Sequence, residues 1–406
     1  MPSKNAPRFL DYRQQMLPLD VALSFGLPRQ LIGCNVRDLV LSGCVLVNNR
    51  EERSCHRLVD RINDTISVID SKDDISSTIP VRDIAKPKYY ICYKPRGVVC
   101  SRRRNEGIDR EYSVLISDWL TRVFQAAANI ANDDNSHNDG LDSTNNIKKK
   151  TAFGADNMTI NTVGRLDEES EGMLLLTNDG SFSRLLCDPE FGLMKTYRVV
   201  VRGSRYSKLI VAEQISLNNQ SNIRNSTVEC KANGEEALHE LLKTSVAERI
   251  KRANDQPTVT TDGNGNETVH HFPFESCNII DIDKLPTQHI SDDSYYVLID
   301  LVLTEGKRHA VRRICKNAQL RVCYLSRISV EGLADQFDVT KPQSIAEAFN
   351  NGYIVSGRHR DVVLDGELVR RANDKDMFVL HSGHVVELSD CEVDRIFALR
   401  KNQNSW

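Results

Sequence analysis

Residues 161–180 read NTVGRLDEESEGMLLLTNDG and join an acidic loop, flanked by two glycines, to a short apolar run. The run Met173–Leu176 predicts a buried strand. The TNDG that follows predicts a turn leading into a helix over 181–187. Asp167 is therefore expected in a loop directly before a buried strand, a position from which a rigid scaffold presents reactive side chains.

Asp167 is the candidate nucleophile of this loop. Arg165 stands two residues earlier and is expected to place its guanidinium beside the carboxylate, which favours the ionised form. An ionised carboxylate in a protected loop can act as a covalent nucleophile. Two alternatives remain open. In the first, Asp167 caps a turn and the neighbouring acidic side chains are solvated. In the second, Asp167 and the neighbouring glutamates bind Mg²⁺, although adjacent carboxylates do not by themselves build an octahedral site.

The same stretch resembles the central motif of the pseudouridine synthases, V-G-R-L-D-x-x-[ST]-x-G-L-L-L-L-T-N-D-G, in the branch that modifies bacterial ribosomal RNA. Every specified position matches except Met173, a conservative change. Four other stretches resemble further blocks of this family in the same order: KYYICYKPRGVVC at 88–100, KTYRV at 195–199, EGKRHAVRRI at 305–314 and LSDCEV at 388–393. A match of this extent is specific, unlike a lone glycine motif.

The resemblance implies an α+β fold. A small N-terminal RNA-binding module over 15–75 is expected to precede a catalytic domain over 86–400 with a mixed, largely antiparallel sheet and flanking helices. Three insertions are expected to interrupt the catalytic domain, at 124–158, 213–292 and 335–380. The first is rich in Asn, Asp and Ser and poor in large apolar residues, which predicts disorder. The second contains a helical pattern over 234–253.

The N-terminal module has a recognisable order of elements. The patterns predict short helices over 17–27 and 36–41, a strand over 45–47, a turn at Asn48 and Asn49, and a strand over 62–70. This order resembles the alpha-L RNA-binding motif, whose phrase G-x-V-x-V-N-G is matched over 43–49 except that Asn49 replaces the last glycine. Asn tolerates the left-handed backbone of such a turn.

Arg37 is the residue of this module assigned to RNA. It alone remains of the basic pair that opens the second helix in the motif, and four other arginines could compensate for the missing partner: Arg29, Arg50, Arg53 and Arg57. Clustered cations favour RNA contact. The alternative is an ordinary small module whose arginines are solvated.

The resemblance also implies the reaction and the residues that perform it. Family members isomerise a uridine within RNA to pseudouridine, after the base is flipped out of its stack. The catalytic aspartate corresponds to Asp167, and the sequence leaves open whether it attacks the anomeric carbon or supports elimination to a glycal. The aromatic residue that stacks on the extruded base corresponds to Tyr197. The basic neighbour of the aspartate corresponds to Arg312, the apolar lining of the uracil pocket to Val311, and the arginine that positions the loop to Arg165.

Two segments carry a strong positive charge although the whole chain has a net charge of −3. Residues 86–112 hold eight basic and three acidic residues, and residues 305–327 hold seven basic residues and one acidic residue. Local fields rather than the net charge attract phosphates. Lys94, Arg96 and Lys307 are therefore expected to bind the RNA backbone.

The remaining composition narrows the function. The eleven cysteines show neither CxxC nor zinc spacing, no apolar run is long enough to span a membrane, and the N-terminus lacks a secretory signal. A cytoplasmic monomer is expected, with nucleus and organelles open, whose partner is RNA, foremost ribosomal RNA, and which uses no metal and no cofactor.

Two other functions compete with this reading. Ala310 replaces a Gln of the family motif, which, with the long insertions, motivates a catalytically silent RNA-binding or ribosome-assembly protein. A metal-dependent nuclease that uses the acidic loop is the weaker alternative.

Overall fold

The computed structural model describes residues 13–26, 34–71, 74–81, 87–101, 114–133, 160–188, 191–204, 233–255, 258–261, 267–270, 274–283, 294–304, 309–354, 366–371 and 376–403. The chain divides into two compact units, one comprising Met1–Tyr90, Thr121–Asn161 and Leu176–Leu185, the other Ile91–Leu120, Thr162–Leu175 and Leu186–Trp406. The predicted domain bounds, 15–75 and 86–400, remain predictions. Within the described ranges, no helix is long and apolar enough to cross a membrane.

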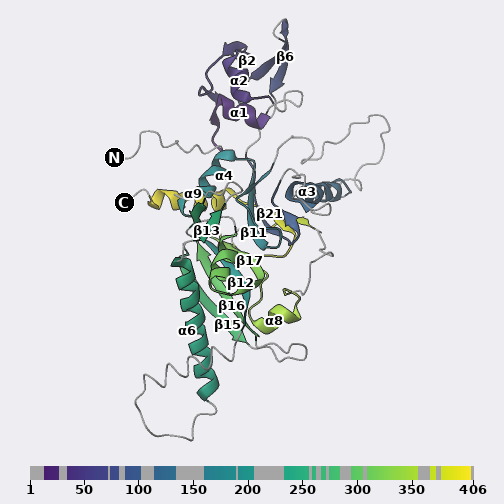
Figure 1. Ribbon diagram of the computed structural model, residues 1–406. Helices are drawn as coiled ribbons and strands as arrows, with labels where there is room; N and C mark the ends of the chain where they lie inside the picture. The colour runs from purple at the N-terminus through teal and green to yellow at the C-terminus, as the bar shows by residue number, and fades with distance from the viewer. Residues whose placement is uncertain are drawn as a thin grey trace, which may run out of the picture. The chain divides into compact units, whose positions relative to one another are not determined.

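The N-terminal part of the first unit forms a small α+β module (Figure 1). Its elements are β1 (Met16–Pro18), α1 (Leu19–Gly26), α2 (Val36–Leu41), β2 (Val45–Val47), β3 (Arg50–Glu52), β4 (Leu58–Asp60), β5 (Ile66–Ser71) and β6 (Asp74–Val81). The sheet order is β3-β2-β5-β6, and β1 pairs with β4. The core includes Leu19, Val40 and Val45, none of which is exposed. The two predicted helices and the strand over 45–47 are confirmed.

The turns of this module follow from its polar residues. Asn48 and Asn49 adopt φ values of 51° and 61°, so the turn uses the left-handed conformation expected of Asn. The predicted strand over 62–70 begins too early, because Asp60 accepts hydrogen bonds from the backbone N–H of Ile62 (2.8 Å) and Asn63 (3.1 Å). This side chain-to-backbone turn leaves the Ile62 side chain 77% exposed.

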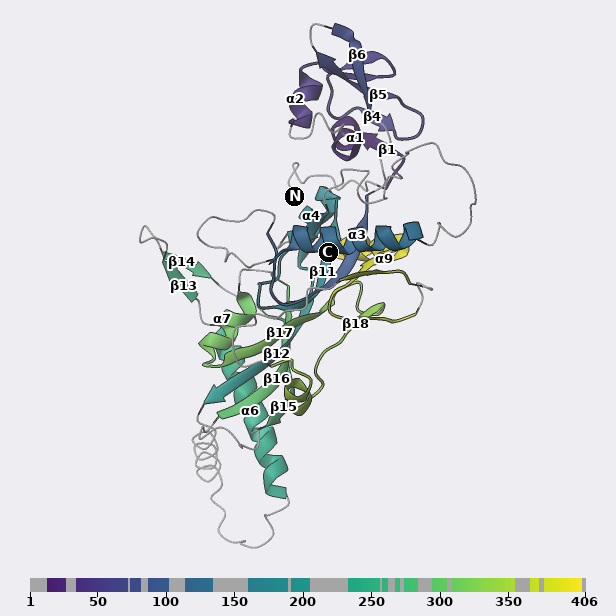
Figure 2. The same ribbon diagram turned by 90° about the vertical axis from the view of Figure 1, so that its right-hand side faces the viewer.

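A nine-stranded mixed sheet contains the remaining large strands, in the order β15-β16-β12-β17-β11-β7-β21-β19, with β10 added on β11. Their bounds are β7 (Tyr89–Lys94), β10 (Asn161–Val163), β11 (Glu171–Thr177), β12 (Lys195–Ser204), β15 (Ser276–Asp283), β16 (Ser294–Leu303), β17 (Arg321–Val330), β19 (Glu367–Val369) and β21 (His384–Glu387). β15, β16, β12 and β17 follow one another as antiparallel strands (Figure 2). β17 pairs with β11 in parallel. The mixed sheet expected from the family resemblance is confirmed.

Helices and shorter strands complete the fold. The helices are α3 (Ile116–Asp133), α4 (Gly180–Cys187), α6 (Asn233–Asp255), α7 (Ala310–Asn317), α8 (Ile345–Asn350) and α9 (Asp390–Gln403). The short pairs are β8 (Val98–Val99) with β9 (Val114–Leu115), β13 (Thr258–Thr261) with β14 (Glu267–His270), and β18 (Phe337–Val339) with β20 (Phe378–Leu380). α8 packs through Ile345 and Ala348 against Val200, Leu298 and Tyr324 of the sheet.

The predicted insertions contain regular structure. α3 extends to Asp133 and buries Phe124, whose ring packs edge-on against Tyr90 with centroids 5.3 Å apart. The prediction of disorder is therefore wrong for 124–133, because an amphipathic helix carries the chain past the last large apolar side chain; 134–158 lies outside the described residues. The helix expected over 234–253 is confirmed as α6, which packs on β15, the edge strand of the sheet.

Asp179 joins β11 to α4. It is completely buried. One carboxylate oxygen accepts hydrogen bonds from the backbone N–H of Ser181 and Phe182, each at 2.9 Å, and the other accepts from the Tyr89 hydroxyl at 2.7 Å. The side chain thus caps α4 and links it to β7.

We expect Asp179→Ala to lower the free energy of unfolding by about 2–4 kcal/mol, since it removes a helix cap and leaves a buried hydroxyl without this acceptor. Tyr89→Phe removes only the hydroxyl and should cost about 1 kcal/mol. Urea titrations followed by circular dichroism measure both. Equal losses for the two variants would contradict the capping role.

Candidate active site

The loop that carries Asp167 is fixed by its backbone. Gly164 adopts a φ of 71°, which opens the turn out of β10. The N–H of Gly97 donates to the carbonyl of Glu168 at 2.8 Å, and the N–H of Ser170 donates to the carbonyl of Asp167 at 3.1 Å. The Asp167 side chain remains 29% exposed, so a restrained loop presents a carboxylate that solvent can reach.

A close approach of two strands fixes the end of this loop. Gly172 pairs with Arg327 where β11 meets β17 in parallel. It has a φ of 107°, and a Cβ atom here would collide with the Arg327 carbonyl oxygen. Only glycine meets both conditions, which explains its position in the acidic loop motif.

Arg312 of α7 lies beside the candidate nucleophile. Its Nε stands 3.5 Å from Oδ2 of Asp167. Its Nη2 donates to the Ser170 hydroxyl at 3.3 Å, and Nη1 lies 3.7 Å from the Glu169 carboxylate. One planar guanidinium therefore spans the loop from Asp167 to Ser170, a fork that lysine could not reproduce.

Arg165 lies elsewhere than expected. Its side chain is exposed, and among the described residues the ion-pair partners of the Asp167 carboxylate are His309 and Arg312. The expectation that Arg165 stands beside Asp167 is wrong, because the chain turns after Gly164 and residues two apart then point in different directions. The neighbouring guanidinium comes instead from Arg312, far along the sequence.

His309 is a neighbour of Asp167 to which sequence analysis assigned no role. Its Nε2 lies 3.8 Å from Oδ1 of Asp167, and its side chain is 40% exposed. It precedes α7 in a left-handed conformation, with a φ of 58°. The only sequence signal was its place in the EGKRHAVRRI block. Protonated His309 would add a second positive charge to the carboxylate.

Tyr197 and Val311 occupy sheltered positions. Tyr197 of β12 is 9% exposed and pairs with Arg327 of β17, which in turn pairs with Gly172 of β11. Tyr197, Arg327 and Gly172 therefore lie in one row across three neighbouring strands, and Gly172 belongs to the strand that follows the Asp167 loop. Val311 is 5% exposed and precedes Arg312 on α7, and Ala310, at the helix start, is 7% exposed.

Two cations of the opening block, Lys94 and Arg96, are held inside the protein, whereas Lys88 is exposed. Lys94 is completely buried, and its Nζ donates to the carbonyls of Pro95 (2.8 Å) and Val98 (2.9 Å). Burial lowers the pKa of Lys94 from 10.5 to about 8, against the opposing attraction of nearby acidic groups, Cys100 foremost. The predicted phosphate contact by Lys94 is wrong, because its buried ammonium group donates its hydrogen bonds to backbone carbonyls of the turn.

Arg96 is likewise held inside the protein. Its Nε forms an ion pair with Glu171 at 2.9 Å, where both side chains are more than four-fifths buried. Its Nη2 donates to the Tyr353 carbonyl at 2.6 Å. The predicted contact of Arg96 with RNA phosphates is therefore wrong as well. Lys307, the third predicted phosphate ligand, lies outside the described residues.

The acidic loop shows no sign of a metal site. Within the part of the chain that the structure describes, no group of three His, Cys, Asp or Glu side chains converges as metal ligands would. The ion-pair neighbours of Asp167 are instead the guanidinium of Arg312 and the imidazole of His309.

Residues 88–317 match the family model described as RNA pseudouridylate synthase. The chain belongs to this family. The matched region runs from β7 to α7 and contains Asp167, Tyr197 and Arg312, so the residues gathered at the candidate site all lie within the synthase region.

Curated relatives include ribosomal large subunit pseudouridine synthase B of Bacillus subtilis, 30% identical over 118 residues, which are 29% of this chain and 33% of that protein. A putative chloroplastic ribosomal large subunit pseudouridine synthase, SVR1 of Arabidopsis thaliana, is 24% identical over 73% of this chain and 50% of its own length. The chain thus spans half or less of these relatives.

Solved structures with similarity include one described as a pseudouridylate synthase, at 16% identity and a TM-score of 0.33, covering 94% of this chain and 99% of that one. Another is human RNA pseudouridylate synthase domain containing 4, at 11% identity and a TM-score of 0.27, covering 58% and 64% of the two chains.

Burial of Lys94 has a measurable consequence. Because its pKa is about 8 in the folded protein and 10.5 when solvated, the unfolded chain binds more protons between these values and stability rises with pH there. Relative to Lys94→Met, the wild type should gain about 3 kcal/mol of unfolding free energy between pH 7 and pH 10.5. Urea titrations across this range test it, and parallel pH profiles would contradict the assignment.

Proposed function

We propose that the protein is an RNA pseudouridine synthase that isomerises a specific uridine of ribosomal RNA, with Asp167 as its nucleophile. The observation that carries the proposal is the Asp167–Arg312 pair, with 3.5 Å between Nε and Oδ2, inside the region that matches the synthase family. The guanidinium lies beside a carboxylate that solvent can reach, and a carboxylate in such a position can act as a covalent nucleophile.

The reaction rearranges bonds without adding or removing atoms. In the nucleophilic route an Asp167 oxygen attacks the anomeric carbon of the flipped uridine while the bond from that carbon to the base nitrogen breaks. The uracil rotates, its C5 bonds to the anomeric carbon with release of Asp167, and the C5 proton moves away as the nitrogen takes up a proton. In the elimination route the same carboxylate supports formation of a glycal. Neither route changes oxidation state, so neither requires a redox cofactor.

Neighbouring residues have separate tasks in this proposal. Arg312 restrains Oδ2 of Asp167, so that Oδ1 faces the substrate near His309. Tyr197 stacks on the flipped base, which is worth about 1–3 kcal/mol for an aromatic contact, and Val311 lines the apolar side of the uracil pocket. Arg165, exposed beside the loop, is left to contact RNA rather than to orient the nucleophile.

Ribosomal RNA is the target class that the relatives favour, since the Bacillus and Arabidopsis proteins are both described as ribosomal large subunit pseudouridine synthases. In the N-terminal module, the Arg37 side chain is 64% exposed and its Nε lies 3.5 Å from Oδ2 of Asp20, an exposed ion pair that contact with RNA would replace. We infer a monomer that acts in the cytoplasm. The chloroplastic description of the Arabidopsis relative makes an organelle the competing location.

Asp167→Asn is nearly isosteric but removes the nucleophilic charge, so we expect pseudouridine formation to fall by at least about a thousandfold. Carbodiimide mapping of ribosomal RNA incubated with the purified protein measures the product. Glu168→Gln makes the same chemical change one residue away and should retain activity. Undiminished activity of Asp167→Asn would rule out this residue as the nucleophile.

The second candidate function is a silent RNA-binding protein, which Ala310 at the start of α7 favours. We expect deletion of the gene to remove a pseudouridine from ribosomal RNA of one compartment, and Asp167→Asn to fail to restore it. Site-resolved carbodiimide mapping of total cellular RNA distinguishes the cases. Unchanged pseudouridine in every RNA class would favour the silent binder.

A further inference from the structure

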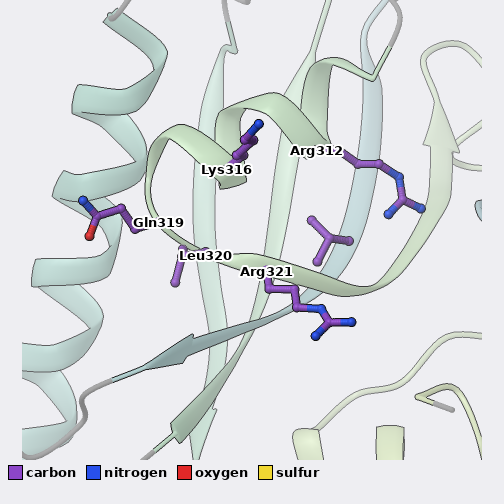
Figure 3. A pocket seen from close by; sticks show the side chains of 6 residues that line it. Arg312, Lys316, Gln319, Leu320 and Arg321 are labelled. Carbon is purple, nitrogen blue, oxygen red and sulfur yellow. The ribbon is translucent and has the colours of Figure 1, made fainter. Parts of the chain in front are cut away.

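A groove of about 420 Å³ lies at the corner between α7 and β17, directly beside the candidate active site. It is lined by Arg312, Lys316, Gln319, Leu320, Arg321 and Val322, and Figure 3 shows how these side chains surround the corner. Arg312, the neighbour of Asp167, forms one end of it. No acidic residue lines the groove.

Local backbone geometry builds this corner. Arg312 and Lys316 stand four residues apart on α7 and so share a helix face. The helix ends at Asn317, and Gln319, the residue after the C-cap Ala318, takes the left-handed conformation with a φ of 58°. The N–H of Leu320 then donates to the Cys315 carbonyl at 2.8 Å, which completes a Schellman turn and sends the chain straight into β17 at Arg321.

α6 braces the same corner from the predicted insertion. The Arg249 guanidinium donates to the carbonyl of Ala318, the C-cap of α7, at 2.6 Å and to the Tyr295 hydroxyl at 2.8 Å. This satisfies a carbonyl that the end of α7 leaves free. The cations of the groove therefore stand on a rigid support.

Of the three cations that line the groove, Arg312 pairs with Asp167 and Glu169. Lys316 and Arg321 are exposed, and among the described residues no carboxylate lies within ion-pair distance of either. Two exposed cations on a rigid support, next to a third that is already paired, form a positive surface that attracts anions such as phosphate.

We propose that this groove binds backbone phosphates of the substrate RNA next to the flipped uridine. The choice of RNA rests on the proposed function. A base extruded toward Asp167 leaves its flanking phosphates at the rim of the site, where Lys316 and Arg321 line the same groove as Arg312. Contacts of this kind follow the backbone without reading the sequence.

The test measures affinity for oligocytidine rC20, which contains no uridine, so that failure of the groove is distinguishable from failure of the isomerase. Fluorescence anisotropy at 50–300 mM KCl gives the affinity and its salt dependence. Lys316→Gln and Arg321→Gln should each weaken binding at 100 mM KCl by about fivefold and reduce the slope of log K against log salt by about 0.7, the value for one phosphate of a single strand. The double variant should reduce the slope by about 1.4.

Matched controls are Lys251→Gln on α6 and Arg395→Gln on α9, exposed cations outside the groove, which should bind as wild type does. Thermal melting of each variant reports its folding, and Lys316→Arg, which keeps the charge, should restore the slope. Wild-type affinity and slope in the double variant, equal losses in the controls, or no salt-dependent binding of rC20 by the wild type would each overturn the proposal.

Discussion

The candidate site depends on one ion pair between parts of the chain that are distant in sequence, Asp167 in its loop and Arg312 on α7, with 3.5 Å between Nε and Oδ2. Parallel pairing of β11 with β17 makes this meeting geometrically possible. The loop enters β11 from one end and α7 leads into β17, so both reach the same region of the sheet. Gly172 permits the close contact with the Arg327 backbone. Because the pair is partly buried, solvent screens it less than it would screen a fully exposed ion pair.

Positive charge is used for two different purposes around this pair. Lys94 is buried and Arg96 is largely buried, and they hold backbone carbonyls and Glu171, whereas Lys316 and Arg321 are exposed without acidic partners among the described residues. The segments look alike in sequence because both are rich in Lys and Arg. What separates Lys94 and Arg96 from Lys316 and Arg321 is burial, which depends on tertiary packing. A charge count thus locates a basic surface only after the fold decides which cations reach it.

Local patterns predicted the parts of the fold that local energetics determine. The apolar run in 161–180, the helix after Asp179 and the left-handed turn at Asn49 follow from neighbouring residues. Two predictions failed because a polar or distant partner overrode the local pattern. The backbone N–H of Ile62 donates to Asp60, which places Ile62 in a turn instead of a strand. The carboxylate of Asp167 pairs with Arg312 of α7 rather than with Arg165. The Tyr197 row across the sheet required the register of three strands, which no short pattern contains.

The segment between β12 and β16 shows why an insertion need not be incidental to a site. It contributes β15 to the sheet edge and α6 to the support of α7, where Arg249 donates to the last turn of the helix that carries Arg312. A short helix ending in a non-glycine left-handed residue is intrinsically weak. Additional packing from α6 therefore stabilises the element on which both the Asp167 pair and the cationic groove depend, and changes in the inserted segment should act on the site through this helix.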